Sequence, residues 1–96
     1  MSNSRDQNFK PDLYVVARII KALIDDGPMK KTRLSTYAEL SYDKFISYME
    51  WMVNRGFLKE SDGEVSVLEE GVETYNRLVE WILKYVGKLK FSRRRF

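Results

Sequence analysis

The chain has 96 residues, with 17 Lys and Arg against 14 Asp and Glu, so its formal net charge is +3. An apolar fraction of 44% is typical of a globular protein, and the length fits one domain. Cys and His are both absent, which excludes disulfides, zinc clusters, thiolate nucleophiles and imidazole bases.

No run of the sequence reaches the roughly 18–20 apolar residues that a membrane span needs. The first eight residues are polar and lack the apolar centre of a signal peptide. We therefore expect a cytoplasmic protein, nucleoid-associated or in a host cytoplasm if viral, with no membrane partner. Residues 1–10 are expected to be a flexible leader.

Positive charge is concentrated at the C-terminus. The last 13 residues contain no acid and six basic side chains: Lys84, Lys88, Lys90, Arg93, Arg94 and Arg95. The other 83 residues therefore carry a net charge of −3. A basic tail over 91–96 attracts nucleic acid or anionic lipid, and the alternative is a solvated end that aids solubility.

The first predicted helix follows Pro11-Asp12. Its apolar residues recur at helical spacing: Leu13, Val16, Ala17, Ile20 and Leu23, with Ile24 beside them. Asp25-Asp26-Gly27-Pro28 ends it, because Gly suits a C-terminal cap and Pro cannot continue a helix.

Two more helices are predicted over 31–38 and 42–55, joined by a tight turn with Leu40 tucked inward. The residues expected to be buried in the first of them are Leu34, Tyr37 and Ala38. Ser41 is the expected cap of the second, Gly56 ends it, and its apolar stripe is Phe45, Met49, Met52 and Val53.

A hairpin and a long helix complete the chain. Strands are predicted over 57–60 and 64–67, because Asp62-Gly63 between them is a strong hairpin signal. The final helix is predicted over 69–89. This order predicts a mainly α fold with a small β-hairpin, a winged helix-turn-helix domain over 11–68 followed by a C-terminal helix over 69–90.

Specific residues carry a family resemblance. They are Lys31-Thr32-Arg33-Leu34, Tyr37-Ala38-Glu39-Leu40-Ser41-Tyr42, Tyr48-Met49 and Arg55-Gly56-Phe57-Leu58. Across about 12–86 the chain resembles the small archaeal winged helix-turn-helix DNA-binding proteins, crenarchaeal chromosomal or viral. The resemblance implies a homodimer formed through the last helix and binding to double-stranded DNA.

Two departures from that family are visible. The hairpin leads into the last helix through Leu68-Glu69-Glu70-Gly71, where the family usually has a Thr cap, a basic pair and Gly. The hairpin itself carries Glu60, Asp62 and Glu64 against Lys59. Phosphates should repel such a wing, so we do not expect it to enter the minor groove.

In a helix-turn-helix the second helix lies in the major groove and its N-terminal residues contact bases. The residues predicted to contact DNA are Lys30, Lys31, Thr32, Arg33, Ser41, Tyr42, Lys44, Ser47, Tyr48, Arg93, Arg94 and Arg95. Packing is the alternative role for Tyr42 and Tyr48, and solvation is the alternative for the basic residues near 31. Asp43 and Glu50 either accept from cytosine amino groups or act as helix-dipole and solvating charges.

The last helix carries an apolar seam that alternates by three and four residues, as in a coiled coil. The predicted dimer interface is Tyr75, Leu78, Val79, Ile82, Tyr85, Val86 and Leu89. The alternative is a helix folded wholly onto its own domain. Trp51 is expected on the outer arc of helix 42–55, in contact with a partner, the last helix or a second subunit.

These features predict a duplex DNA-binding homodimer, a transcriptional regulator or a chromatin-associated factor. One alternative is a winged-helix protein-interaction module that uses Trp51 and the acidic wing, and another is membrane-surface attachment through 91–96. No glycine-rich phosphate loop, nucleophile elbow or metal constellation is present, so we expect no enzyme activity, no cofactor, no metal and no small-molecule ligand.

Overall fold

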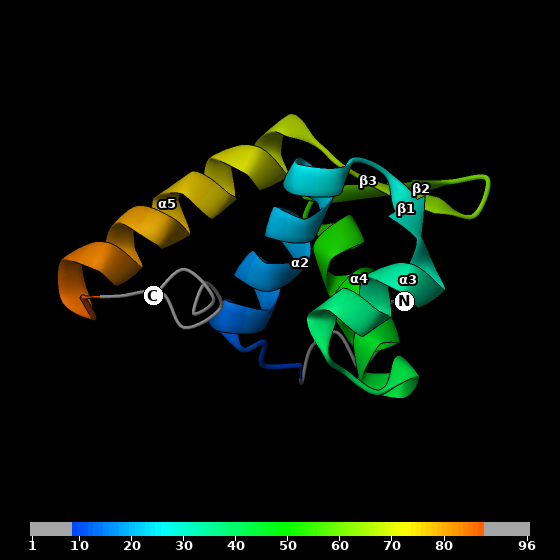
Figure 1. Ribbon diagram of the computed structural model, residues 1–96, viewed down its shortest axis with the longest axis horizontal. Coiled ribbons are helices and arrows are strands. Elements are labelled where there is room, and N and C mark those ends of the chain that lie inside the picture. The colour runs from blue at the N-terminus through cyan, green and yellow to red at the C-terminus, as the bar shows by residue number, and fades with distance from the viewer. Residues whose placement is uncertain (1–8, 88–96) are drawn as a thin grey trace.

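The computed structural model describes residues 9–87 (Figure 1). Its elements in chain order are α2 (Leu13–Asp26), β1 (Met29–Lys30), α3 (Lys31–Ala38), α4 (Tyr42–Asn54), β2 (Leu58–Ser61), β3 (Glu64–Val67) and α5 (Glu69–Tyr85). The architecture is mainly helical with a three-stranded antiparallel sheet, as in a winged helix-turn-helix.

Helix α2 is the centre of the fold. The Asp12 side chain caps it by accepting a hydrogen bond from the Tyr14 N–H at 2.8 Å, and Gly27 at φ 82° donates back to the Leu23 carbonyl. Such a φ favours Gly, which is why the helix ends there. Helix α5 crosses one side of α2, and the α3–α4 pair lies on its other side (Figure 1).

The core fills the space between these helices and the sheet. Eight large side chains are essentially inaccessible to solvent: Phe45, Ile19, Ile20, Leu34, Met52, Leu58, Val16 and Val65. They come from α2, α3, α4 and two strands, so each of these elements is fixed by burial on the same apolar cluster. Leu40, in the turn before α4, also packs on this cluster, as predicted.

The sheet has one strand more than the sequence predicted. Its order is β1-β3-β2, with Met29 opposite Val65 and Leu58 opposite Val67. Asp62 and Gly63 both have positive φ, which is the conformation of a type I′ hairpin turn. We call the β2–β3 hairpin, residues 58–67, the wing.

The turn between α3 and α4 sets the angle of the helix-turn-helix. Glu39 takes a left-handed conformation, φ 60° and ψ 42°, and its N–H donates to the Thr36 carbonyl. The Arg18 guanidinium reaches from α2 and donates to the Ala38 carbonyl at 2.8 Å. Ser41 then caps α4 by accepting from the Lys44 N–H, as the sequence predicted.

Gly71, in the first turn of α5, packs closely against the backbone of Phe57, just before the wing. A Cβ at this position would lie 2.4 Å from the Phe57 carbonyl oxygen, so only Gly allows this approach. Tyr75 and Leu78 then pack on the core, and burial raises the pKa of the Tyr75 hydroxyl.

Several burial predictions are wrong. Tyr37 and Val53 were expected inside, but 40% and 36% of their surfaces are exposed, because each lies at the edge of its helix's apolar face. Leu13 and Ile24, at the two ends of α2, are exposed as well. Helix α5 ends at Tyr85 rather than 89, and Leu89 lies outside the described residues.

The leader prediction is also wrong at its last residues. Phe9 packs on the core, with its ring 4.8 Å from that of Tyr48 in an edge-on arrangement and 6.2 Å from that of Trp51. The described chain therefore begins with a segment that is held against α4.

Candidate nucleic-acid interface

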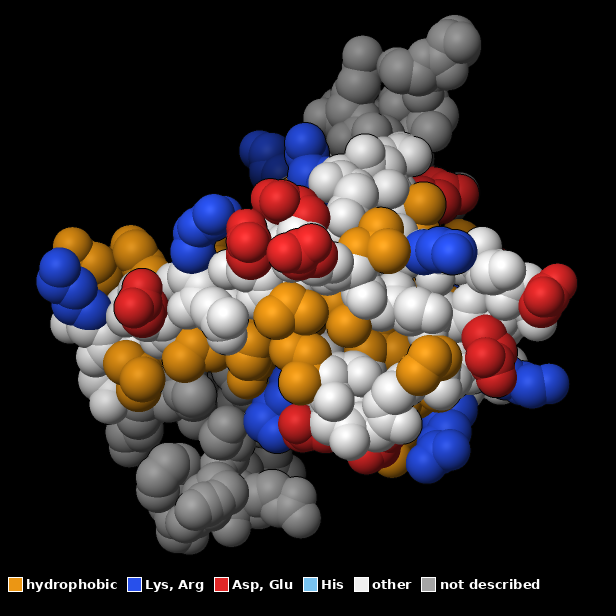
Figure 2. Space-filling view, turned by 90° about the horizontal axis from the view of Figure 1, so that it is seen from above, with side chains coloured by type: hydrophobic (Ala, Val, Ile, Leu, Met, Phe, Trp, Pro, Cys, Tyr) orange, Lys and Arg blue, Asp and Glu red, His pale blue; other side chains and the backbone are white. Residues whose placement is uncertain are grey.

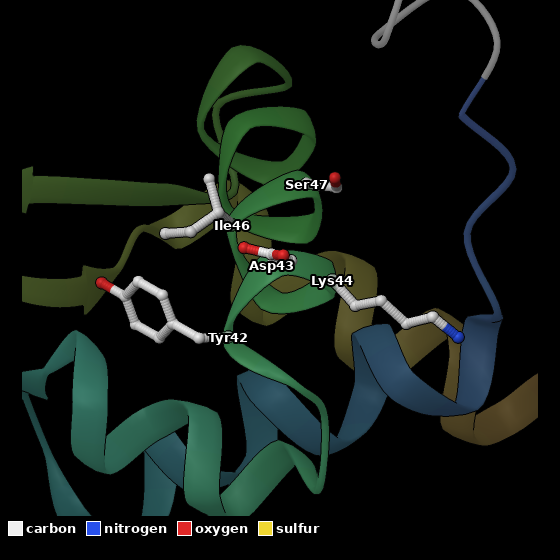
Figure 3. Close-up of a pocket in the computed structure, with 5 residues that line it drawn as sticks. All are labelled: Tyr42, Asp43, Lys44, Ile46 and Ser47. Carbon is white, nitrogen blue, oxygen red and sulfur yellow. The ribbon is translucent and has the colours of Figure 1, made fainter.

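The N-terminal half of α4 presents a shallow hollow lined by Tyr42, Asp43, Lys44, Ile46 and Ser47, which we call the recognition face. Figure 3 shows Tyr42 and Ile46 pointing to one side of the helix and Lys44 and Ser47 to the other, with Asp43 between them. The buried Phe45 and Met49 hold the opposite side of α4 against the core. The recognition face is therefore fixed and accessible.

Three of the predicted contact residues on α4 lie on this face, and two do not. Tyr42 is 46% exposed, so it is available to a partner, and Lys44 and Ser47 are also accessible. The Ser41 hydroxyl oxygen caps the helix by accepting a hydrogen bond from the Lys44 N–H. Tyr48 is 7% exposed, and its hydroxyl accepts a hydrogen bond from the Asp12 N–H at 2.9 Å. Packing, the alternative role considered for Tyr48, is the one observed.

The start of α3 forms a basic corner of Lys30, Lys31 and Arg33. Lys30 is the N-cap residue, and no side chain accepts from the first N–H groups of α3, so these donors are left for another acceptor. Exposed Thr32 lies in the same turn. Backbone donors beside basic side chains suit a phosphate group.

The wing partly neutralises this corner. The Lys31 ammonium lies 2.8 Å from Glu60 Oε2 on β2. The hydrogen bond to Glu60 raises the pKa of Lys31, and the nearby Tyr42 hydroxyl also raises this pKa. Lys31 therefore connects three parts of the surface: α3, the wing and the recognition face.

Arg33 has partners of its own. Its guanidinium hydrogen-bonds to the Tyr37 hydroxyl at 3.4 Å and lies 5.7 Å from the centre of that ring. The hydrogen bond to Tyr37 raises the pKa of Arg33. The Tyr37 hydroxyl in turn donates to Asp26 Oδ2 at 2.8 Å, which anchors α3 to the end of α2.

Trp51 is only half exposed, because aromatic residues of the same chain cover part of it. Its ring lies 5.9 Å from that of Phe57 and 4.7 Å from the Arg55 guanidinium carbon. Together with Phe9, these residues give Trp51 packing partners within the chain. A second subunit is not needed to explain it.

The predicted dimer seam divides into two parts along α5. Tyr75 and Leu78 pack on the core of their own chain, and Ile82 is 3% exposed. Tyr85 and Val86 are 63% and 47% exposed, whereas Val79 is intermediate. The inner part of the seam is therefore partly covered within one chain, and the dimer interface over the whole seam stays a prediction.

The outer end of α5 is apolar and exposed. Trp81 and Leu83 join Tyr85 and Val86 there, and the Trp81 and Tyr85 rings lie 5.1 Å apart. Figure 2 shows hydrophobic side chains at this left-hand end, and acidic side chains at the opposite end, where the wing lies. We call these four residues the α5 apolar end.

Sequence reasoning missed three residues that lie beside the candidate site residues or Trp51. It did not identify Ile46 as part of the recognition face, Glu60 as the partner of Lys31, or Phe9 as the cover of Trp51. Contacts between distant segments leave no spacing signal in a single sequence. Arg93, Arg94 and Arg95 lie outside the described residues.

Residues 9–87 contain neither a cluster of metal ligands nor a membrane-spanning helix. No group of three or more acidic side chains there is placed to hold a metal ion. No helix in the same range is long and apolar enough to cross a membrane.

Comparisons with known proteins agree with this geometry. A family model described as winged helix-turn-helix matches residues 12–85. An uncharacterized protein of Methanocaldococcus jannaschii is 28% identical over 82 residues, 83% of this chain and 84% of the relative. An uncharacterized protein of Archaeoglobus fulgidus is 36% identical over 67 residues, 68% of this chain and 75% of the relative.

Both relatives are archaeal, and the matched region contains every element from α2 to α5. Winged helix-turn-helix domains generally bind DNA and typically have no enzymatic activity. The chain belongs to an archaeal family of winged helix-turn-helix proteins.

Proposed function

We propose that this protein binds duplex DNA, as a transcriptional regulator or chromatin-associated factor, and places α4 in the major groove. The recognition face supports this most strongly, because it is accessible at the N-terminal half of α4 while the opposite side of that helix is anchored in the core. This is the geometry with which recognition helices present side chains to base edges.

Phosphate contacts would come from the basic corner rather than the wing. Lys30 and Lys31 stand beside uncapped N–H groups at the start of α3, an arrangement that suits an anion. The wing exposes Glu60, Asp62 and Glu64, which phosphates repel. The three consecutive arginines of the C-terminal sequence would add sequence-independent attraction.

We further propose that the functional form is a homodimer held together by the α5 apolar end. The Trp81 and Tyr85 rings lie one helical turn apart in a tilted contact, and both side chains are more than half exposed. Exposed aromatic pairs of this kind are typical of interfaces rather than of monomer surfaces. Two copies joined here would present two α4 helices to one DNA duplex.

The test is binding of a fluorescent random-sequence duplex of about 25 bp, followed by anisotropy at about 50 mM salt, where non-specific affinity is measurable. The double variant Lys31→Ala/Lys44→Ala should bind at least tenfold more weakly than wild type. Lys21→Ala/Arg77→Ala is the charge-matched control, because these two cations lie on α2 and α5 and pair with Asp25 and Glu73. Equal binding by wild type and the double variant would contradict the proposal.

A second candidate function is a protein-interaction module. The carboxylate of Asp43 in the middle of the recognition face and the acidic wing favour it. In that case wild type would not bind the duplex at all under the same conditions, and the Lys31→Ala/Lys44→Ala variant would keep its protein partner.

A further inference from the structure

The recognition face has an unusual charge distribution for a surface that meets DNA. Its central side chain is the acid Asp43, and its one cation, Lys44, points away to the side (Figure 3). None of the ion pairs within residues 9–87 involves Asp43. A carboxylate with no ion-pair partner in this described range opposes general phosphate binding, so its place on the recognition face needs a favourable role to be explained.

The edges of bases in the major groove provide such a role. A carboxylate accepts hydrogen bonds and cannot donate them. Cytosine offers an N4 amino donor in the major groove, whereas guanine offers acceptors alone. Adenine also has an amino donor, but its N7 acceptor lies beside it and repels a carboxylate.

The neighbours of Asp43 further narrow the choice of base that the recognition face would suit. Tyr42 and Ile46 lie together on one side of it and give the hollow an apolar wall, which suits the C5 edge of a pyrimidine (Figure 3). Ser47, on the other side, can donate to or accept from either kind of base. Together these side chains match a cytosine next to a thymine better than a purine.

We propose that Asp43 is a specificity-determining residue that accepts a hydrogen bond from the N4 amino group of a cytosine in the major groove. This rests on the proposed DNA-binding function. Asp43 would lower affinity for most sequences by repelling phosphates and restore it at sites that place a cytosine opposite it. The alternative role, stabilising the α4 dipole, acts on folding and not on base preference.

The test begins with selection of preferred duplexes by wild type from a random pool. Wild type, Asp43→Asn and the charge-matched control Glu80→Gln, on α5, are then titrated with a selected duplex, the same duplex with the cytosine pair changed to T·A, and a random duplex. Thermal unfolding of each variant shows that it is folded.

We expect Asp43→Asn to change affinity in opposite directions for the selected duplex and the random duplex. Asp43→Asn should weaken binding to the selected duplex about tenfold, remove discrimination against the T·A duplex and strengthen binding to the random duplex. Such a base-pair dependence is a coupling between the two partners that a structural role would not produce.

Two results would overturn the inference. If wild type binds DNA but Asp43→Asn strengthens binding to all three duplexes equally, Asp43 is a repulsive charge and the proposed function stands without it. If wild type binds no duplex, the proposed function fails and the inference fails with it.

Discussion

The ion pair between Lys31 and the wing makes a quantitative prediction about DNA binding. Within the basic corner, Lys31 already forms an ion pair, because its ammonium nitrogen lies 2.8 Å from Glu60 Oε2. Replacing Glu60 with Gln removes the negative charge and keeps the shape of the side chain. Lys31 should then be free to neutralise a phosphate, and the wing should repel DNA less.

The size of the effect follows from the geometry. The Lys31 and Glu60 side chains are 29% and 38% exposed, so the pair contributes at most about 1 kcal/mol to folding. A carboxylate about 6 Å from a phosphate in water costs about 0.7 kcal/mol, which corresponds to about threefold in affinity. One more neutralised phosphate adds about 0.9 to the magnitude of the salt slope.

The assay is an anisotropy titration of Glu60→Gln with a random duplex at several salt concentrations, with Glu80→Gln on α5 as the charge-matched control. We expect at least threefold tighter binding by Glu60→Gln at low salt, a steeper salt slope and a slightly lower melting temperature. Identical affinities and slopes for the two variants would refute the idea that the wing competes with DNA for Lys31.

Three further predictions concern stability and assembly. Gly71→Ala should lower the free energy of unfolding by about 1–3 kcal/mol in urea titration, because its Cβ would lie 2.4 Å from a backbone oxygen, and an unchanged midpoint would contradict the close approach. Tyr48→Phe should cost about 1 kcal/mol in the same assay and leave DNA affinity unchanged, and weaker DNA binding would contradict its packing role. Trp81→Ser/Tyr85→Ser should sediment as a monomer where wild type is a dimer, and an undiminished dimer would exclude the α5 apolar end as the interface.

Local signals in the sequence predicted most elements accurately. The bounds of α3 and β3 agree with prediction, because a strong turn signal lies beside each of them. Ser41 is the helix cap that was expected, since its side chain can reach a free N–H group in the first turn of α4. Asp12, which directly precedes the first predicted helix, caps α2 in the same way. The order of elements was therefore sufficient to indicate the winged helix-turn-helix fold.

Contacts between distant segments were not predictable in the same way. Strand β1 has two residues, which are too few to show any periodicity. It forms because its backbone pairs with β3, which comes much later in the sequence. Tyr48 has an apolar ring and a polar tip, so its sequence position is compatible with a DNA contact or with packing. The Asp12 N–H and Phe9, both far away in sequence, decide in favour of packing.

The seam of α5 shows the same limit. A heptad pattern predicts that one side of a helix is covered, but it does not say by what. Here α2 of the same chain covers Tyr75 and Leu78, whereas Trp81 and Tyr85 extend beyond the domain and remain exposed. One pattern therefore contains both an intramolecular contact and a candidate dimer surface.

The measurement that tests the central proposal most directly is the salt dependence of wild-type binding to a random duplex. If Lys30, Arg33 and Lys44 each neutralise one phosphate while Lys31 stays paired with Glu60, the plot of log affinity against log salt should have a slope of about −2.7 or steeper. That result would establish a phosphate-dominated DNA-binding protein. No binding at about 50 mM salt and micromolar protein would contradict DNA binding by this fold.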